Sequence, residues 1–151
     1  MDRYLLLIIM ADGLIWSRSS FGKLASGNFP ENLGSTLTKF ASKNPYPWIK
    51  DFLENIAIPN SYIFGLLTQW GELLTALSII IASIYLIKRS QKNRFVLVLL
   101  MLGLLGGMFL NAVFWLASSW TSPSADGLNL LMFIIQGIGL ARVMNLLRSK
   151  G

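Results

Sequence analysis

The chain contains neither cysteine nor histidine. Disulfides, thiol–disulfide exchange, metal sites built on thiolate or imidazole ligands, and catalytic triads that use either residue are therefore excluded. Axial haem ligation through these two residue types is excluded as well. Whatever chemistry the chain performs uses carboxylates, amides, hydroxyls, Lys, Arg or aromatic side chains, or belongs to a partner. We expect no metal ion and no covalently attached cofactor.

Charge is also scarce. Only 13% of the 151 residues are charged, 54% are hydrophobic, and the mean hydropathy is +0.57. This balance is well to the apolar side of soluble domains. The net charge of +6 comes from bases beside apolar segments, which is typical of membrane-flanking charge and not of a nucleic-acid-binding face. The composition predicts one integral membrane domain, residues 1–151, that binds no nucleic acid.

Four apolar segments have the length of about 20 residues that a membrane-spanning helix needs. They cover residues 4–23, 62–87, 95–120 and 128–147. A cleaved signal peptide is an alternative for the first segment, but its basic flank is a single Arg and no small-x-small cleavage site follows. The predicted fold is all-α, a bundle of four transmembrane helices.

Residues 30–58, between the first two spans, show helical periodicity without the length to span. Apolar residues recur at helical spacing in two sets, Leu33, Leu37 and Phe40, then Trp48, Phe52 and Ile56. Pro45 and Pro47 separate the two sets. We expect two short amphipathic helices that rest at the membrane interface and cover the bundle; the alternative is an ordinary soluble loop.

The basic residues near the spans predict the orientation. They crowd the connection between spans two and three and follow span four: Lys88, Arg89, Lys92, Arg94, Arg148 and Lys150. The turn between spans three and four has none. The positive-inside rule then places both termini in the cytoplasm. Three lysines in the first loop argue against this, but that loop is longer and also holds acidic residues.

Glu72 lies near the middle of the second span, where an isolated charge is costly. A rise of about 1.5 Å per residue places Arg18 about 21 Å, Glu72 about 22 Å and Asn111 about 24 Å from the cytoplasmic end of their helices. We expect Arg18 and Glu72 to form an ion pair, bridged by Asn111. Thr68, Gln69, Glu72 and Thr75 fall on one helix face, which we expect to point inward.

Asp12 and Arg142 are predicted to form a second, structural polar pair, because their depths are similar and their helices belong to the same bundle. Ser19 and Lys23 share the face of Asp12. This polar seam has two interpretations: a network that fixes helix register, or a pocket for a quinone headgroup or another amphipathic ligand. Trp16, Trp70 and Trp115 would provide flat walls for such a pocket.

Several pieces of the sequence resemble the DoxX/DoxD-like family of membrane proteins. In chain order they are FGKL (21–24), NPYPWIKDFLE (44–54), GELL (71–74), Asn111 and TSPSADGLNLLMF (121–133). The resemblance implies a four-helix membrane bundle in which Lys23, Glu72, Asn111 and Asn129 occupy the family's polar positions. Some relatives are described as the membrane subunit of a thiosulfate:quinone oxidoreductase or as members of membrane redox complexes, and more distant ones as trafficking or assembly factors.

The resulting hypothesis is an accessory subunit of a larger respiratory or photosynthetic electron-transfer complex. It would lie in a prokaryotic-type inner membrane or a thylakoid membrane and bind a quinone or lipid. The candidate ligand-binding residues are Arg18, Lys23, Trp70, Glu72, Asn111 and Trp115. One alternative is a quinone-linked oxidoreductase subunit in which Glu72 and Lys23 exchange protons with the quinone. Another is a membrane-protein assembly or trafficking factor, so whether the chain is part of an enzyme stays open.

Overall fold

The computed structural model describes residues 1–89 and 93–149. Four helices are long and apolar enough to cross a membrane: α1 (Arg3–Ser26), α4 (Ser61–Lys88), α5 (Arg94–Ser118) and α6 (Pro123–Arg148). The shorter elements are α2 (Phe29–Ser42), α3 (Pro47–Phe52), the π-helical turn η1 (Leu53–Ala57) and the 3-10 turn η2 (Ser119–Thr121). The described residues contain no strand. The predicted all-α bundle is confirmed, and its four candidate spans fit a multi-pass membrane protein.

Local signals in the sequence set most of the helix ends. The side chains of Asp2, Asn93 and Ser122 each accept a hydrogen bond from a backbone N–H in the first turn of α1, α5 and α6, respectively. Such caps satisfy donors that the helix itself leaves free. Pro123 occupies the first position of α6, and Gly27 ends α1 with a φ of 70°. The predicted spans 4–23, 62–87 and 128–147 lie within α1, α4 and α6 and are a few residues shorter than these helices. The third predicted span, 95–120, covers most of α5 and ends within η2.

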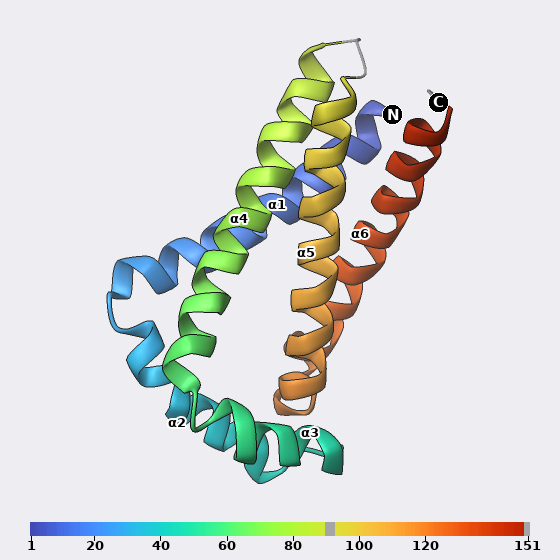
Figure 1. The fold of residues 1–151 in the computed structure, drawn as a ribbon. Helices are drawn as coiled ribbons and strands as arrows, with labels where there is room; N and C mark the ends of the chain where they lie inside the picture. Colours follow the sequence, from blue (N-terminus) through green and yellow to red (C-terminus); the bar gives the residue numbers. More distant parts are fainter. Residues whose placement is uncertain (90–92, 150–151) are drawn as a thin grey trace.

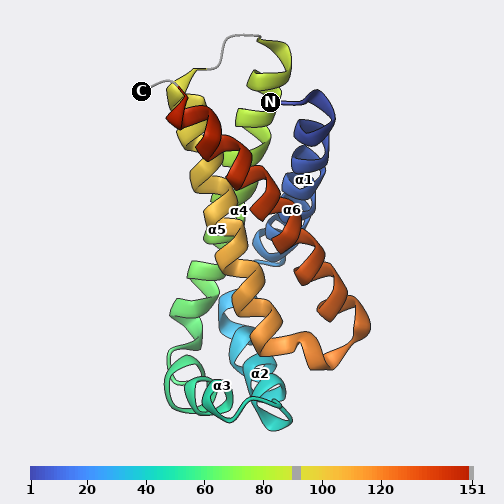
Figure 2. The same ribbon diagram turned by 90° about the vertical axis from the view of Figure 1, so that its right-hand side faces the viewer.

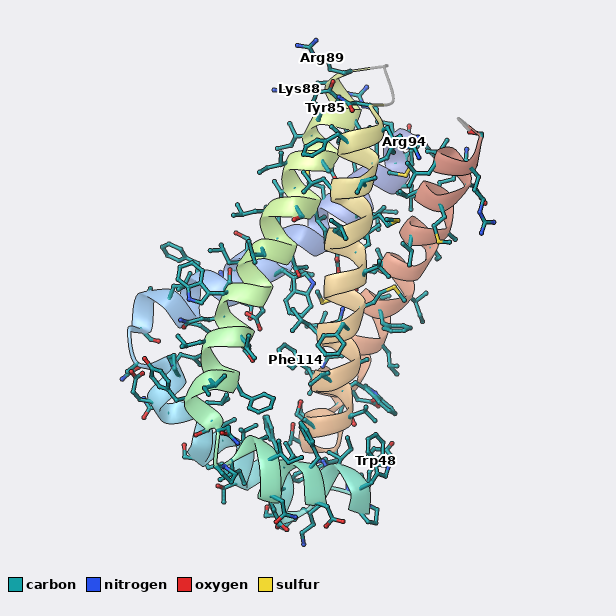
Figure 3. All side chains as sticks on the ribbon, viewed as in Figure 1. Trp48, Tyr85, Lys88, Arg89, Arg94 and Phe114 are labelled. Carbon is teal, nitrogen blue, oxygen red and sulfur yellow. The ribbon has the colours of Figure 1, made fainter. Side chains whose placement is uncertain are left out.

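The helices are arranged with two distinct ends (Figure 1). The short helices α2 and α3 lie across one end, and both termini, the end of α4 and the start of α5 lie at the other, as Figure 2 also shows. Helix α1 is strongly inclined relative to α5. Lys88, Arg89 and Arg94 lie at the end that holds the termini (Figure 3). Lys92 and Lys150, which also entered the orientation prediction, lie outside the described residues.

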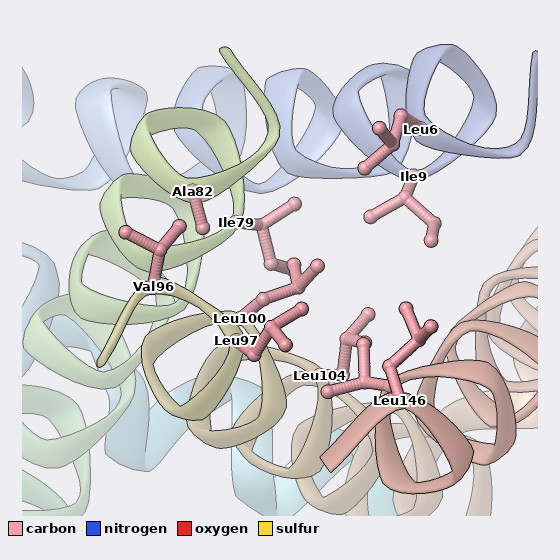
Figure 4. Packing of buried hydrophobic residues seen from close by; sticks show 10 residues of the cluster. Leu6, Ile9, Ile79, Ala82, Val96, Leu97, Leu100, Leu104 and Leu146 are labelled. Atoms are coloured by element: carbon pink, nitrogen blue, oxygen red, sulfur yellow. The ribbon is translucent and has the colours of Figure 1, made fainter. Parts of the chain in front are cut away.

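All four long helices contribute to the main apolar core, part of which is shown in Figure 4. Its fully buried members include Ile9 of α1, Ile79 of α4, Leu100 of α5 and Val143 of α6. Close approach of α4 and α5 depends on Gly103, because a Cβ there would lie 2.9 Å from Ser78 Cβ and 3.0 Å from Ile79 Cγ1. In a lipid environment such close packing is a main source of helix association.

The segment between α1 and α4 is an ordered cap on the bundle, not a soluble loop. It has its own apolar cluster, made by Leu33, Leu37, Ala41, Ile49, Leu53 and Ala57. Asn44 Nδ2, between α2 and α3, donates to the backbone oxygens of Leu116 and Ala117 at the end of α5, both at 3.1 Å. The prediction of two amphipathic helices is therefore confirmed, with a π-helical turn continuing the second.

The second cap helix has two apolar stripes, and the one noted in the sequence is the exposed one. Trp48, Phe52 and Ile56 are 61%, 39% and 49% exposed, and Trp48 projects from α3 in Figure 3. The buried stripe begins one residue later, with Ile49, Leu53 and Ala57. Both stripes are apolar and have the same four-residue spacing, so the periodicity could not distinguish them. The exposed stripe gives this helix a second apolar face, as expected of an element at a membrane interface.

Candidate functional site

One polar cluster joins the end of α1 to the middle of α4. Lys23 Nζ lies 2.8 Å from Glu72 Oε1 and 2.7 Å from Oε2, and it also donates to Ser19 Oγ at 2.7 Å. The Glu72 side chain is 0% exposed, and the Lys23 side chain is 21% exposed. An ammonium group has three N–H donors, and here each has an acceptor. Phe29 adds a ring 5.3 Å from the ammonium.

The predicted ion pair between Arg18 and Glu72 is therefore wrong, because Lys23 is the partner of Glu72. Arg18 is exposed on the outer side of α1, whereas Trp16 and Ser20, two residues before and after it, are buried. Two residues correspond to about 200° around a helix, so Arg18 lies on the opposite face. Counting depth along the helix also assumed upright helices, and α1 is inclined (Figure 1).

A second polar cluster, the amide chain, joins α1, α6 and α5. Gln136 Nε2 donates to Asp12 Oδ2 at 2.8 Å, and Asn111 Nδ2 donates to Gln136 Oε1 at 3.0 Å. Asp12 is 2% exposed, and Gln136 and Asn111 are 0% exposed. Gly107 makes room for the amide chain, since a Cβ at this position would lie 2.5 Å from Gln136 Nε2. Three helices thus meet through buried polar side chains at membrane depth.

The amide chain corrects two predictions. Asp12 accepts from Gln136 and does not pair with Arg142, whose side chain is exposed. Asn111 also does not bridge Arg18 and Glu72 but bonds to Gln136. Sequence reasoning missed Gln136 altogether. The available signal was an uncharged amide in the middle of an apolar span, which needs a buried hydrogen-bond partner just as a charge does.

Several buried polar atoms near the amide chain lack a hydrogen-bond partner within the described residues. They include Asp12 Oδ1, Trp16 Nε1 and Asn111 Oδ1. Trp16 belongs to a small apolar cluster with Ala76 and Met132, and its ring centroid lies 6.0 Å from that of Phe114. Phe114 itself projects between α5 and α4 in Figure 3. Unpartnered buried groups are uncommon in folded proteins and often mark a place for a ligand or water.

Asn111 also lines a hollow of about 240 Å³ between α5 and α6, which we call the α5/α6 hollow. Its other lining residues are Ala112, Trp115, Leu116, Asn129, Leu130 and Phe133. Trp115 is held in place because its Nε1 donates to Asp126 Oδ1 at 2.6 Å. This volume is small for a whole ligand but sufficient for a ring or headgroup. A larger hollow of about 330 Å³ lies against a single chain segment, and none of its lining residues is a buried polar one: Ile81, Ile84, Tyr85, Lys88 and Arg89.

The six candidate ligand-binding residues divide into three groups. Asn111 and Trp115 line the α5/α6 hollow, together with Asn129. Lys23 and Glu72 form the saturated ion pair, and neither lines that hollow. Arg18 and Trp70 are exposed, with 50% of Trp70 accessible on the outside of α4, so neither joins the other candidates. The predicted inward face of α4 is present, because Gln69, Glu72 and Thr75 are buried.

Comparison of the chain with protein-family models, with curated proteins and with solved structures found no match to any of them.

Proposed function

We propose that the chain is an integral membrane accessory subunit of a larger electron-transfer complex and that it holds the headgroup of a quinone or lipid in the α5/α6 hollow. The observation that supports this most directly is Asn111, a fully buried residue beside the hollow whose Oδ1 has no hydrogen-bond partner among the described residues. An unsatisfied polar group beside a space of headgroup size is the arrangement expected of an amphipathic binding site.

The composition supports an accessory role. With no Cys or His in the sequence, the chain has neither the thiolates that hold iron–sulfur clusters nor the imidazole and thiolate ligands of most haem proteins. A partner would therefore carry the electron-transferring cofactor. The resemblance to the DoxX/DoxD-like family points the same way, and two of the polar positions it indicates, Asn111 and Asn129, line the α5/α6 hollow.

Proton exchange between a quinone and the Lys23–Glu72 pair is less well supported. All three N–H donors of Lys23 have acceptors, and both carboxylate oxygens of Glu72 face the ammonium. A general acid or base needs access to the proton that it transfers. Since Glu72 is 0% exposed and outside the hollow, we assign the pair a structural role that joins α1 to α4.

For the orientation, we assign the end that holds the termini to the cytoplasm. Lys88, Arg89 and Arg94 lie at that end, and cytoplasmic flanks of membrane helices are enriched in such residues. The cap made by α2, α3 and η1 would then lie at the opposite membrane surface of a prokaryotic-type inner membrane or a thylakoid membrane. Reactivity of single cysteines, introduced at Arg89 and at Lys43, toward a membrane-impermeant reagent in intact cells would test this assignment.

Purification from its native membrane in a mild detergent tests the proposed function. We expect a stoichiometric partner with visible absorption from a bound cofactor, and a quinone or lipid in the extract identified by mass spectrometry. Asn111→Leu should lower the amount of that ligand at least about fivefold, while the matched outer-surface variant Trp70→Phe should retain it. A stable chain without any partner, or one that associates only transiently with many membrane proteins, would contradict the accessory role and favour an assembly factor.

A further inference from the structure

We infer that the α5/α6 hollow selects a ligand that donates a hydrogen bond to Asn111, namely a hydroxyl group on a quinol ring or on a lipid headgroup. A quinone, whose ring carries carbonyl acceptors, would be bound more weakly than its quinol. This inference rests on the proposed function to the extent that an amphipathic ligand occupies the hollow.

The amide chain determines which end of Asn111 is left free. Gln136 Nε2 donates to Asp12 Oδ2 at 2.8 Å, so the oxygen of the same amide is turned away from Asp12. The Oε1 of Gln136 then faces Asn111 and accepts a hydrogen bond from Asn111 Nδ2. Because each amide has one donating and one accepting end, Asn111 is left with Oδ1 as its unpartnered atom. Asp12, on α1, thus sets the hydrogen-bonding character of a residue on α5.

The other polar and aromatic groups of the hollow agree with this selection. Asn129 Nδ2 already donates to its own helix, to Ala125 O at 2.6 Å, so its oxygen is the less satisfied end. Trp115 and Phe133 provide flat apolar walls suited to a ring. Asn111 Oδ1 is shielded from solvent, so binding requires small side-chain movements around it, as is common at binding sites.

The selection can be measured with the purified full chain in detergent by titration calorimetry. One arm compares decylubiquinol, kept reduced under argon, with decylubiquinone. A second arm compares phosphatidylglycerol, which has headgroup hydroxyls, with phosphatidylcholine, which has none. We expect the donating member of a pair to bind about tenfold more tightly, which corresponds to one additional satisfied buried hydrogen bond. The arm in which this occurs identifies whether the ligand is a quinol or a lipid.

Asp12→Asn tests the cause of the preference. An amide at position 12 can accept or donate, so Gln136 and Asn111 become free to reverse, and the preference should fall to less than about threefold while binding persists. If this variant does not fold by circular dichroism, Asn111→Ala tests the acceptor itself: it leaves the Asp12–Gln136 bond in place, and the preference should be lost. Trp70→Phe should keep the full preference.

The possible results separate the two proposals. Equal binding of donor and acceptor ligands by the unaltered chain, or an unchanged preference in Asp12→Asn, would overturn the selection but leave the proposed ligand site standing. Absence of binding in both arms would overturn the ligand site and the selection together. A donor preference that disappears in Asp12→Asn supports both.

Discussion

The two buried polar clusters differ in how completely their hydrogen bonds are satisfied. The Lys23–Glu72 cluster is charged, and each donor of the ammonium has an acceptor. The amide chain is built around one carboxylate and two amides, and within residues 1–89 and 93–149 its atoms Asp12 Oδ1 and Asn111 Oδ1 have no partner. Saturation is expected of a structural link, whereas unmet acceptors beside a hollow are expected of a binding site. The charged residues attracted attention in the sequence, but the uncharged amides provide the better candidate site.

The largest expected effect comes from removing the ammonium of Lys23, the partly exposed partner in the Lys23–Glu72 ion pair. Lys23→Met leaves the Glu72 carboxylate buried and unpaired, so we expect the free energy of unfolding to fall by about 3–5 kcal/mol. Glu72→Gln should cost less, because Lys23 is 21% exposed and can turn its ammonium toward water. Unfolding in mixed detergent–SDS micelles measures both values.

The double variant Lys23→Met/Glu72→Gln should recover most of the loss, since no uncompensated buried charge remains. The exposed pair Lys50–Glu54 is a matched control, and Glu54→Gln should change the free energy of unfolding by about 0.5 kcal/mol or less. If Lys23→Met costs no more than this control, the ion pair does not hold α1 against α4.

An intermediate effect is expected from crowding the amide chain. Gly107→Ala places a Cβ 2.5 Å from Gln136 Nε2, so Gln136 must move away from Asp12 and Asn111. We expect a loss of about 1–3 kcal/mol in the same unfolding measurement. At Gly137, a Cβ would meet only Met108 Cε at 3.8 Å, so Gly137→Ala should be neutral or slightly stabilising. Equal effects of the two substitutions on the free energy of unfolding would mean that the protein tolerates displacement of Gln136 from the amide chain.

The smallest effect concerns the third acceptor of Lys23. Ser19→Ala removes one hydrogen bond from the ammonium but keeps both contacts with Glu72, so we expect a loss of about 1 kcal/mol. Ser35→Ala, which removes an exposed intrahelical hydrogen bond in α2, is the control and should change the free energy of unfolding by less than about 0.5 kcal/mol. A loss no greater than that of the control would show that the ion pair does not need its third acceptor.

The fold was predictable to a large extent because its signals are local. Apolar runs of spanning length identified the four long helices, and capping residues such as Asn93 and Ser122 lie at their starts. The inward face of α4 was also correct, since Gln69, Glu72 and Thr75 all belong to one helical face. The periodicity of the cap was less informative: it revealed the helices but not which apolar stripe of the second one is buried.

The pairing of polar side chains was not predictable in the same way. Charge complementarity allowed both Arg18 and Lys23 as partners of Glu72, and depth along the chain favoured the wrong one because it ignored the inclination of α1. Gln136 was missed although an amide in the middle of an apolar span also needs a hydrogen-bond partner. Its role depends on the close approach of α5 and α6 at Gly107, which no single segment reveals.

By itself, the sequence determined that the chain builds four apolar helices long enough to span a membrane, with a helical cap, and that its buried chemistry excludes thiols and imidazoles. These properties depend on composition, length and local periodicity, which each segment carries independently of the others. Only the tertiary structure decided that Lys23 meets Glu72 and that Asp12, Gln136 and Asn111 share one chain of hydrogen bonds. Hydrogen bonds extend over about 3 Å, so the inclination and rotation of whole helices select which polar groups can form them.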